Sequence, residues 1–232
     1  MSNLYYHNRM IPLRDTTKSR TVPFVNYALI GMCGLVFLFE LSLGSASESF
    51  VRLFGVIPAR VQTTLFQWEL SFGVILPLFT SMFIHGGWAH LIGNMLYLHI
   101  FGDNVEDRLG HGGYLFFYLS SGICAALIEV YFQENSSIPL IGASGSIAGV
   151  LGAYFLLFPR ARILTLLPLI IFFPVVEVSA FFFLGFWFLM QFLQGTASTG
   201  ASADGGVAWW AHAGGFVAGI ALLPVFIILR KR

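Results

Sequence analysis

Charged residues are scarce in this chain: they make up 10% of its 232 residues, and the sequence has only two cysteines. Both cysteines, Cys33 and Cys124, lie inside apolar runs, which argues against a disulfide framework and against a zinc cluster. We expect them to be small buried packing residues. The net charge of +1 gives no indication of a nucleic-acid partner, and we expect none.

Hydrophobic residues make up 57% of the chain and gather in runs of about membrane-spanning length. This pattern predicts an all-α integral membrane protein with one helical bundle and no separate soluble domain. We expect six membrane spans, at residues 25–43, 82–101, 114–132, 145–158, 178–192 and 209–229.

Three segments outside these runs have a different character. Residues 1–24 are polar and lack the apolar core of a signal peptide, so we expect an N-terminal tail ahead of a bundle that covers residues 25–232. Residues 44–78 mix aromatic with charged side chains, which favours a long first loop in the headgroup region. Pro168, Pro174 and Glu177 predict a loop that leads into the fifth span.

Basic residues indicate the orientation of the bundle. Six spans place both termini on one side of the membrane, and all of the 12 Lys and Arg residues except Arg52 and Arg60 fall on that side. Cytosolic loops carry an excess of Lys and Arg, so both termini are expected to be cytosolic. We expect a multi-pass protein of a prokaryotic plasma (inner) membrane.

A serine and a histidine, each flanked by small residues, stand at the start of two apolar runs. Gly142-Ala143-Ser144-Gly145 opens the fourth run, and Ala211-His212-Ala213-Gly214-Gly215 lies at the start of the sixth. Counted along each helix from the basic residues at its cytosolic end, Ser144 and His212 lie at similar heights, about 24 to 27 Å. A lipid-facing histidine would be costly there, so the pair predicts a nucleophile and its base in a water-filled cavity.

The second run carries a further polar set. His90 and Asn94 are four residues apart and share one helix face, whereas His85 and His90, five apart, would point about 140° away from each other. Zinc-binding histidines on a helix stand at i and i+4, so no metal pair is expected. An imidazole and an amide on one face are neutral donors that suit an oxyanion site.

Glycines predict how two of the spans meet. His212, Gly215 and Gly219 share one face of the sixth span, and small residues form a matching stripe on the fourth at Gly145, Gly149 and Gly152. Little hydrophobic force joins helices in lipid, so close backbone approach is what holds them together. We expect the two stripes to pack against each other.

Each motif alone also has a structural explanation. A Gly-X-Ser-Gly motif in a membrane protein most often serves helix packing, and a lone intramembrane histidine is often a satisfied hydrogen-bond partner. The coincidence of a serine, a histidine and a His/Asn pair at one depth on three spans favours catalysis. The soluble-hydrolase motif Gly-X-Ser-X-Gly is not matched, because Ser146 stands where its last glycine should be.

The same residues resemble the rhomboid intramembrane serine proteases over about residues 80–219. The matching positions are His85, His90, Asn94, the segment 105–110, Gly142 to Gly145, and His212 with Gly215 and Gly219. The resemblance implies that Ser144 is the nucleophile and His212 its base, in a dyad without an aspartate. It also implies an oxyanion hole formed by His90, Asn94 and the Ser144 N–H, and it calls for no cofactor and no metal.

Two positions depart from the family pattern. The Trp-Arg pair that many members carry in the first loop is absent, because Trp68 is followed by Glu69. Ala148 stands where some members place a tyrosine that stacks on the catalytic histidine. Either something else orients His212, or its positioning is looser than in those members.

The expected function is cleavage of membrane-embedded segments by a serine endopeptidase. A peptide bond in a lipid-embedded helix is hydrogen-bonded and hidden, so single-span proteins whose helices contain Gly, Pro or polar residues are the expected substrates. A catalytically inactive rhomboid-like chaperone and a small-molecule or ion transporter are the alternatives. The absence of internal repeats argues against a transporter, and the presence of both Ser144 and His212 argues against an inactive relative.

Overall fold

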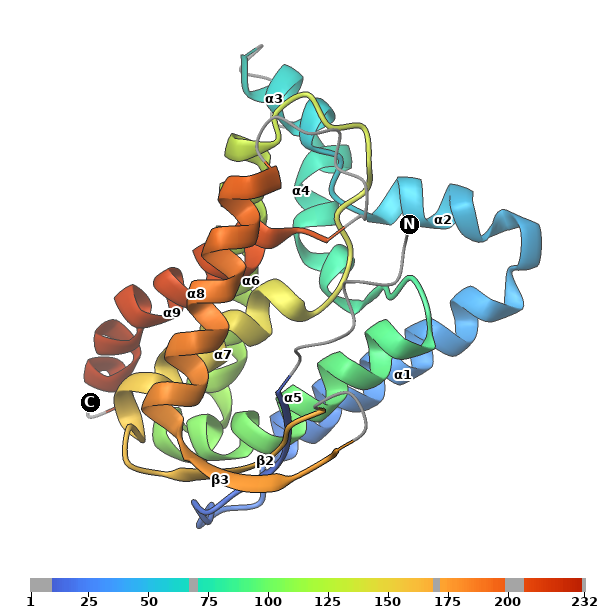
Figure 1. The fold of residues 1–232 in the computed structure, drawn as a ribbon. Coiled ribbons are helices and arrows are strands. Elements are labelled where there is room, and N and C mark those ends of the chain that lie inside the picture. Colours follow the sequence, from blue (N-terminus) through green and yellow to red (C-terminus); the bar gives the residue numbers. More distant parts are fainter. Residues whose placement is uncertain (1–9, 67–70, 169–171, 199–206, 231–232) are drawn as a thin grey trace.

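Apolar helices make up most of the chain in the computed structural model, which describes residues 10–66, 71–168, 172–198 and 207–230 (Figure 1). The predicted runs become the long helices α1 (Phe24–Ser42), α5 (Trp88–Leu109), α6 (His111–Phe132), α7 (Ser144–Leu157), α8 (Ala180–Ser198) and α9 (Trp209–Arg230). Trp68 and Glu69, the departure noted in the first loop, lie outside the described residues.

The predicted count of six spans is not confirmed. Within the described residues, α1, α6, α8 and α9 are long and apolar enough to cross a membrane, and α7 has only 14 residues. A fifth span arises if α5 is joined to the apolar segment Phe72–Phe83, from which it is bent by 80°. The predicted second span, 82–101, was therefore misplaced, because the chain turns at residues 84–87 before α5 begins at Trp88.

Most of the described part of the long first loop is helical. It contains a short 3-10 turn (Gly44–Ala46), then α2 (Ser47–Phe54), α3 (Pro58–Phe66) and α4 (Phe72–Thr80). The start of α3 touches the chain that leads into α7: Val56 and Leu140 form an isolated two-residue bridge, and Ala59 N donates to Ser136 O at 3.0 Å. The first loop thus supports the segment that precedes Ser144.

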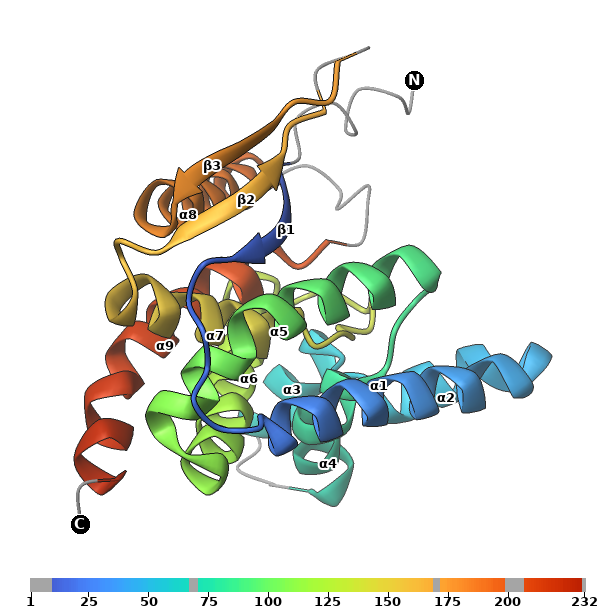
Figure 2. The ribbon, with the colours of Figure 1, turned by 90° about the horizontal axis from the view of Figure 1, so that it is seen from below.

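A three-stranded antiparallel sheet, which the sequence analysis did not predict, lies at one end of the bundle. Its order is β1 (Ile11–Asp15), β2 (Arg162–Leu166) and β3 (Val175–Ser179), so part of the N-terminal tail pairs with the segment after α7. Seen from below in Figure 2, the sheet lies beside α8 and α5. The predicted fifth span began too early, because Val178 belongs to β3 and α8 starts at Ala180.

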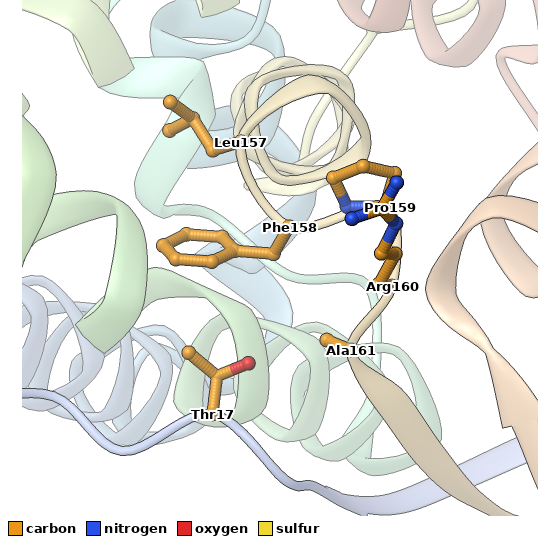
Figure 3. Close-up of a pocket in the computed structure, with 6 residues that line it drawn as sticks. All are labelled: Thr17, Leu157, Phe158, Pro159, Arg160 and Ala161. Carbon is orange, nitrogen blue, oxygen red and sulfur yellow. The ribbon is translucent and has the colours of Figure 1, made fainter.

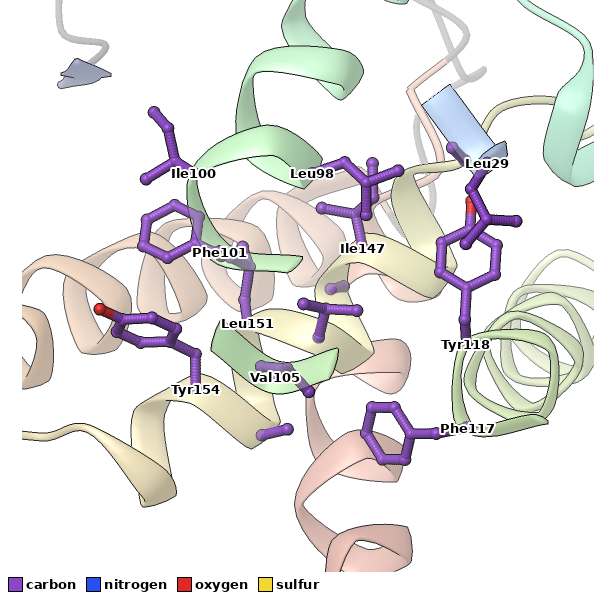
Figure 4. Packing of buried hydrophobic residues seen from close by; sticks show 14 of the residues in the cluster. Leu29, Leu98, Ile100, Phe101, Val105, Phe117, Tyr118, Ile147, Leu151 and Tyr154 are labelled. Atoms are coloured by element: carbon purple, nitrogen blue, oxygen red, sulfur yellow. The ribbon is translucent and has the colours of Figure 1, made fainter. Parts of the chain in front are cut away.

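Helix α7 lies at the centre of the bundle and packs against α5, α6, α8 and α9. Figure 4 shows the apolar cluster around it, with Ile147 and Leu151 of α7 between side chains of α5 and α6. The far end of α7 is tied to the sheet, because the Tyr154 hydroxyl bonds to Asp15 and lies 3.1 Å from Thr17 Oγ1. Ser144, the first residue of α7, therefore lies at the end of the bundle opposite the sheet.

Buried polar groups tie α1 to α5 in the segment 105–110. The Glu106 carboxylate accepts hydrogen bonds from Val25 N at 3.0 Å and Asn26 N at 2.7 Å, which caps the first turn of α1. Asn26 in turn donates to Leu98 O at 3.0 Å and accepts from the Tyr114 hydroxyl at 2.8 Å. The segment 105–110, which matches the family pattern, thus anchors the start of α1 through Glu106.

Glycines join α7 to α9 by direct backbone contact, as the sequence predicted. A Cβ atom on Gly215 would stand 2.3 Å from Gly145 O, and one on Gly219 would stand 2.1 Å from Gly149 O. A Cβ atom on Gly152 would stand 2.2 Å from Phe216 O. No side chain fits between the two helices at these three levels, so the predicted stripes do meet.

We predict that Gly219→Ala lowers the free energy of unfolding by about 1–3 kcal/mol, because the new methyl group must push two backbones apart. Thermal unfolding in detergent measures this change. Gly34→Ala is the matched control, since a Cβ atom there would meet nothing within 4 Å. Equal melting temperatures for the two variants would contradict the close α7–α9 contact.

Candidate active site

Ser144 and His212 meet although 68 residues separate them. The Ser144 Oγ atom lies 2.8 Å from His212 Nε2, and both residues are partly buried. Ser144 comes from the first turn of α7 and His212 from the first turn of α9, so the α7–α9 glycine contact places both at one height. The geometry allows the imidazole to take a proton from the hydroxyl.

The second imidazole nitrogen of His212 faces α8. Its Nδ1 atom lies 2.8 Å from Gln191 Oε1, and Gln191 Nε2 points to Trp187 O at 3.4 Å. Ala148, which lacks the tyrosine ring of some family members, is fully buried in the α7–α9 contact, where a Cβ atom on Gly215 would stand 3.1 Å from its methyl group. Gln191 is the site residue that the sequence analysis missed.

Gly142 lies directly against His90. It has φ +117°, and a Cβ atom there would stand 2.6 Å from His90 Nε2 and 3.6 Å from Asn94 Nδ2. A hydrogen bond of 2.9 Å from Gly142 N to Ser81 O holds this loop in place. The positive φ and the close approach both require glycine, and they bring the loop before Ser144 onto the face of α5 that carries His90 and Asn94.

Hydrogen-bond donors of α5 and α7 lie at the two ends of the segment from Gly142 to Ser144. Asn94 Nδ2 is buried and has no acceptor among the described residues, which is uncommon for a buried amide. The first N–H groups of α7 also lack an acceptor within their own helix, and a helix N-terminus favours negative charge. A developing oxyanion near Ser144 would find donors from the two helices.

His85 does not point away from His90, and that expectation was wrong. The two rings are 5.1 Å apart between centroids at an interplanar angle of 65°. The helical spacing rule does not apply, because His85 precedes the first residue of α5. In the part of the chain that the structure describes, no three His, Cys, Asp or Glu residues come together as metal ligands.

Glu129 of α6 caps the helix that carries His212. Its buried carboxylate accepts a hydrogen bond of 2.7 Å from Ala211 N, next to His212. The first N–H groups of a helix have no acceptor within it, so this contact fixes the first turn of α9. Glu129 and Gln191 could both have been flagged in the sequence, since polar residues inside apolar runs are functional or structural by default.

A cleft elsewhere on the surface is not part of this site. It has a volume of about 420 Å³, lies at the sheet end of α7 and is lined by Thr17 and residues 157–161 (Figure 3). Ser144 begins α7 and Leu157 ends it, so the cleft is about 20 Å from Ser144. It is therefore separate from the Ser144 and His212 site.

Comparison with known proteins identifies the family. A sequence profile described as the rhomboid domain matches residues 68–229. The chain belongs to the rhomboid family. This stretch contains Ser144, His212, Gln191 and the donors His90 and Asn94, so the whole candidate site lies inside the rhomboid domain.

Individual relatives come from bacteria and from mitochondria. The chain is 35% identical to the rhomboid protease GluP of Bacillus subtilis over 132 residues, which is 56% of this chain and 24% of GluP. It is 36% identical over 88 residues to the mitochondrial rhomboid protein 1 of Saccharomyces cerevisiae, covering 36% of this chain and 25% of that protein. The chain thus spans about a quarter of the length of these relatives.

We predict that Gly142→Ala lowers the turnover of any hydrolysis carried out by Ser144 and His212 on the order of 10- to 100-fold, because its methyl group displaces His90 and the loop before Ser144. Gly93→Ala on α5 is the control, since a Cβ atom there would meet nothing within 4 Å. Steady-state kinetics on both variants make the comparison. Wild-type turnover in Gly142→Ala would show that the approach of this loop to His90 is not needed.

Proposed function

We propose that this rhomboid is an intramembrane serine endopeptidase that cleaves transmembrane segments of other membrane proteins. The contact of 2.8 Å between Ser144 Oγ and His212 Nε2, formed inside an apolar bundle, carries the proposal. No other pairing is needed for nucleophilic catalysis: one group attacks and the other holds the proton.

The reaction begins when His212 Nε2 takes the Ser144 proton while Oγ attacks the peptide carbonyl carbon. The carbonyl oxygen becomes an oxyanion, which Asn94, His90 and the N–H groups at the start of α7 stabilise. The carbon–nitrogen bond then breaks, and the imidazolium gives its proton to the leaving amine. Water, activated by the same imidazole, hydrolyses the acyl-serine ester and releases the second product.

The substrates of this reaction are single-span proteins whose membrane helices unwind locally. A helical peptide bond in lipid hides its carbonyl, so helices weakened by Gly, Pro or polar residues reach Ser144 most readily. Basic residues gather near the sheet end, among them Arg160, Arg162 and Arg230, which supports placing that end in the cytosol of a prokaryotic cell and Ser144 towards the outer surface.

We predict that Ser144→Ala and His212→Ala each abolish peptide hydrolysis while leaving a folded, membrane-inserted protein. Each change removes a reacting group and little packing. Purified protein incubated with a panel of single-span substrates gives the measurement, with melting temperature as the folding control. Full cleavage by either variant would refute the dyad.

Metal chelators should leave the turnover of the wild type unchanged, because the proposed reaction uses no metal. Reversible loss of turnover with chelators would point to metal catalysis.

We also predict that Asn94→Ala and His90→Ala lower kcat by about 10² to 10³ with a smaller effect on KM, because an oxyanion donor acts in the transition state. Initial rates over a range of substrate concentrations separate the two constants. Unchanged kcat in both variants would limit this face of α5 to a structural role.

A further inference from the structure

The amide of Gln191 lies where a triad would place its third member. Gln191 is 8% exposed, comes from α8 and meets His212 on the nitrogen that faces away from Ser144. Ring stacking around it holds α8 to α9, with Phe188 and Phe216 stacked at 5.0 Å between centroids. Gln191 is therefore held by packed helices at the back of the imidazole.

The orientation of this amide follows from its second hydrogen bond. Gln191 Nε2 faces Trp187 O at 3.4 Å, and a carbonyl oxygen only accepts, so the amide nitrogen must be on that side. The amide oxygen then faces His212 Nδ1 at 2.8 Å. With the amide turned over, two oxygens would face each other at the Trp187 contact, which is unfavourable.

The amide oxygen determines which His212 tautomer is present. Since Gln191 Oε1 can only accept, Nδ1 must carry the proton, and the lone pair of Nε2 is directed at the Ser144 hydroxyl. That is the tautomer that a general base requires. The same oxygen still accepts from Nδ1–H after Nε2 has taken the serine proton, so the contact persists in the imidazolium state.

Two tryptophan rings also lie near His212, and a ring contact constrains an imidazole less than a hydrogen bond does. The rings of Trp187 and Trp209 are 6.1 and 6.2 Å from the His212 ring between centroids, and the Trp209 ring is nearly perpendicular to it. Neither ring distinguishes one imidazole nitrogen from the other. The Gln191 oxygen does, because it accepts a hydrogen bond from Nδ1 in a defined direction.

We propose that Gln191 is the positioning residue of the catalytic site, which orients His212 and fixes its Nδ1–H tautomer. The inference rests on the proposed function and deepens it. The dyad then depends on three helices: α7 supplies the nucleophile, α9 the base and α8 the group that aims the base. Gln191 takes the orienting part that a carboxylate has in a serine triad, but it does so without a charge inside the membrane.

Three variants separate positioning from packing. Gln191→Leu keeps the size and removes the acceptor; Gln191→Glu keeps an oxygen that can accept, whether it is ionised or protonated. Gln194→Leu makes the same chemical change one helical turn farther along α8 and serves as the matched control. Each purified full-length variant is assayed for kcat and KM on a single-span substrate, for melting temperature, and for the rate at which a fluorophosphonate labels Ser144.

We expect Gln191→Leu to lower kcat and the labelling rate by about 10- to 100-fold with KM little changed, because a misaimed base slows chemistry and not binding. Gln191→Glu should retain most of the turnover, and Gln194→Leu should match the wild type. Wild-type kcat in Gln191→Leu, or equal losses in Gln191→Leu and Gln191→Glu, would overturn the positioning role.

The results that would contradict the proposed function differ from those that would contradict the role of Gln191. Cleavage that persists in Ser144→Ala would contradict the dyad. If cleavage requires Ser144 but its rate is unchanged in Gln191→Leu, only the positioning role is contradicted. If Ser144 of the wild type were labelled but no substrate cleaved, dependence of the labelling rate on Gln191 would still support the positioning role. A wild type whose Ser144 is neither labelled nor active would overturn both.

Discussion

The contact between the backbones of α7 and α9 is the constraint on which the site depends. Cβ atoms on Gly215 and Gly219 would stand 2.3 and 2.1 Å from the carbonyl oxygens of Gly145 and Gly149, so the two backbones approach too closely for any side chain. Ser144 and His212 stand on the first turns of these two helices, and their contact of 2.8 Å follows from that approach. Because there is little hydrophobic force between helices in lipid, glycines supply the fit that side chains supply in a soluble core.

The buried carboxyl groups of Glu106 and Glu129 are satisfied by the fold, whereas the buried amide of Asn94 is not. The Glu106 and Glu129 carboxylates each accept from the first turn of a helix, α1 and α9, and are satisfied by the fold itself. Asn94 Nδ2 is buried beside the site without an acceptor among the described residues. An orphaned donor beside a serine–histidine pair fits a group whose partner forms during the reaction. Among the described residues, five other buried side chains also have a polar atom without a hydrogen-bond partner: His85, Tyr118, Ser121, Ser146 and Trp210.

Hydropathy predicted most of the helices, and small-residue spacing predicted the α7–α9 contact, because both depend on local periodicity. The sheet could not be read in the same way: β1 and β2 are more than a hundred residues apart, and their pairing joins a polar tail to an apolar hairpin. The start of α5 was misplaced for a related reason, since an apolar window does not detect an 80° bend.

Within the site, Ser144 and His212 could be paired from their similar depth, their glycine-rich flanks and the family resemblance, because both are counted from basic residues along regular helices. Gln191 could not be assigned to His212, since nothing in the sequence gives the rotation of α8 about its axis. The ring contact between His85 and His90 was missed because His85 lies in a turn, where helical geometry gives no direction.

We propose that His212 activates Ser144 and no other serine as the nucleophile. Peptide mass spectrometry of the purified protein after fluorophosphonate treatment locates the modified residue. We expect one modified residue, Ser144, and loss of the modification in His212→Ala. Modification of a different serine, or undiminished modification of Ser144 when His212 is alanine, would contradict it.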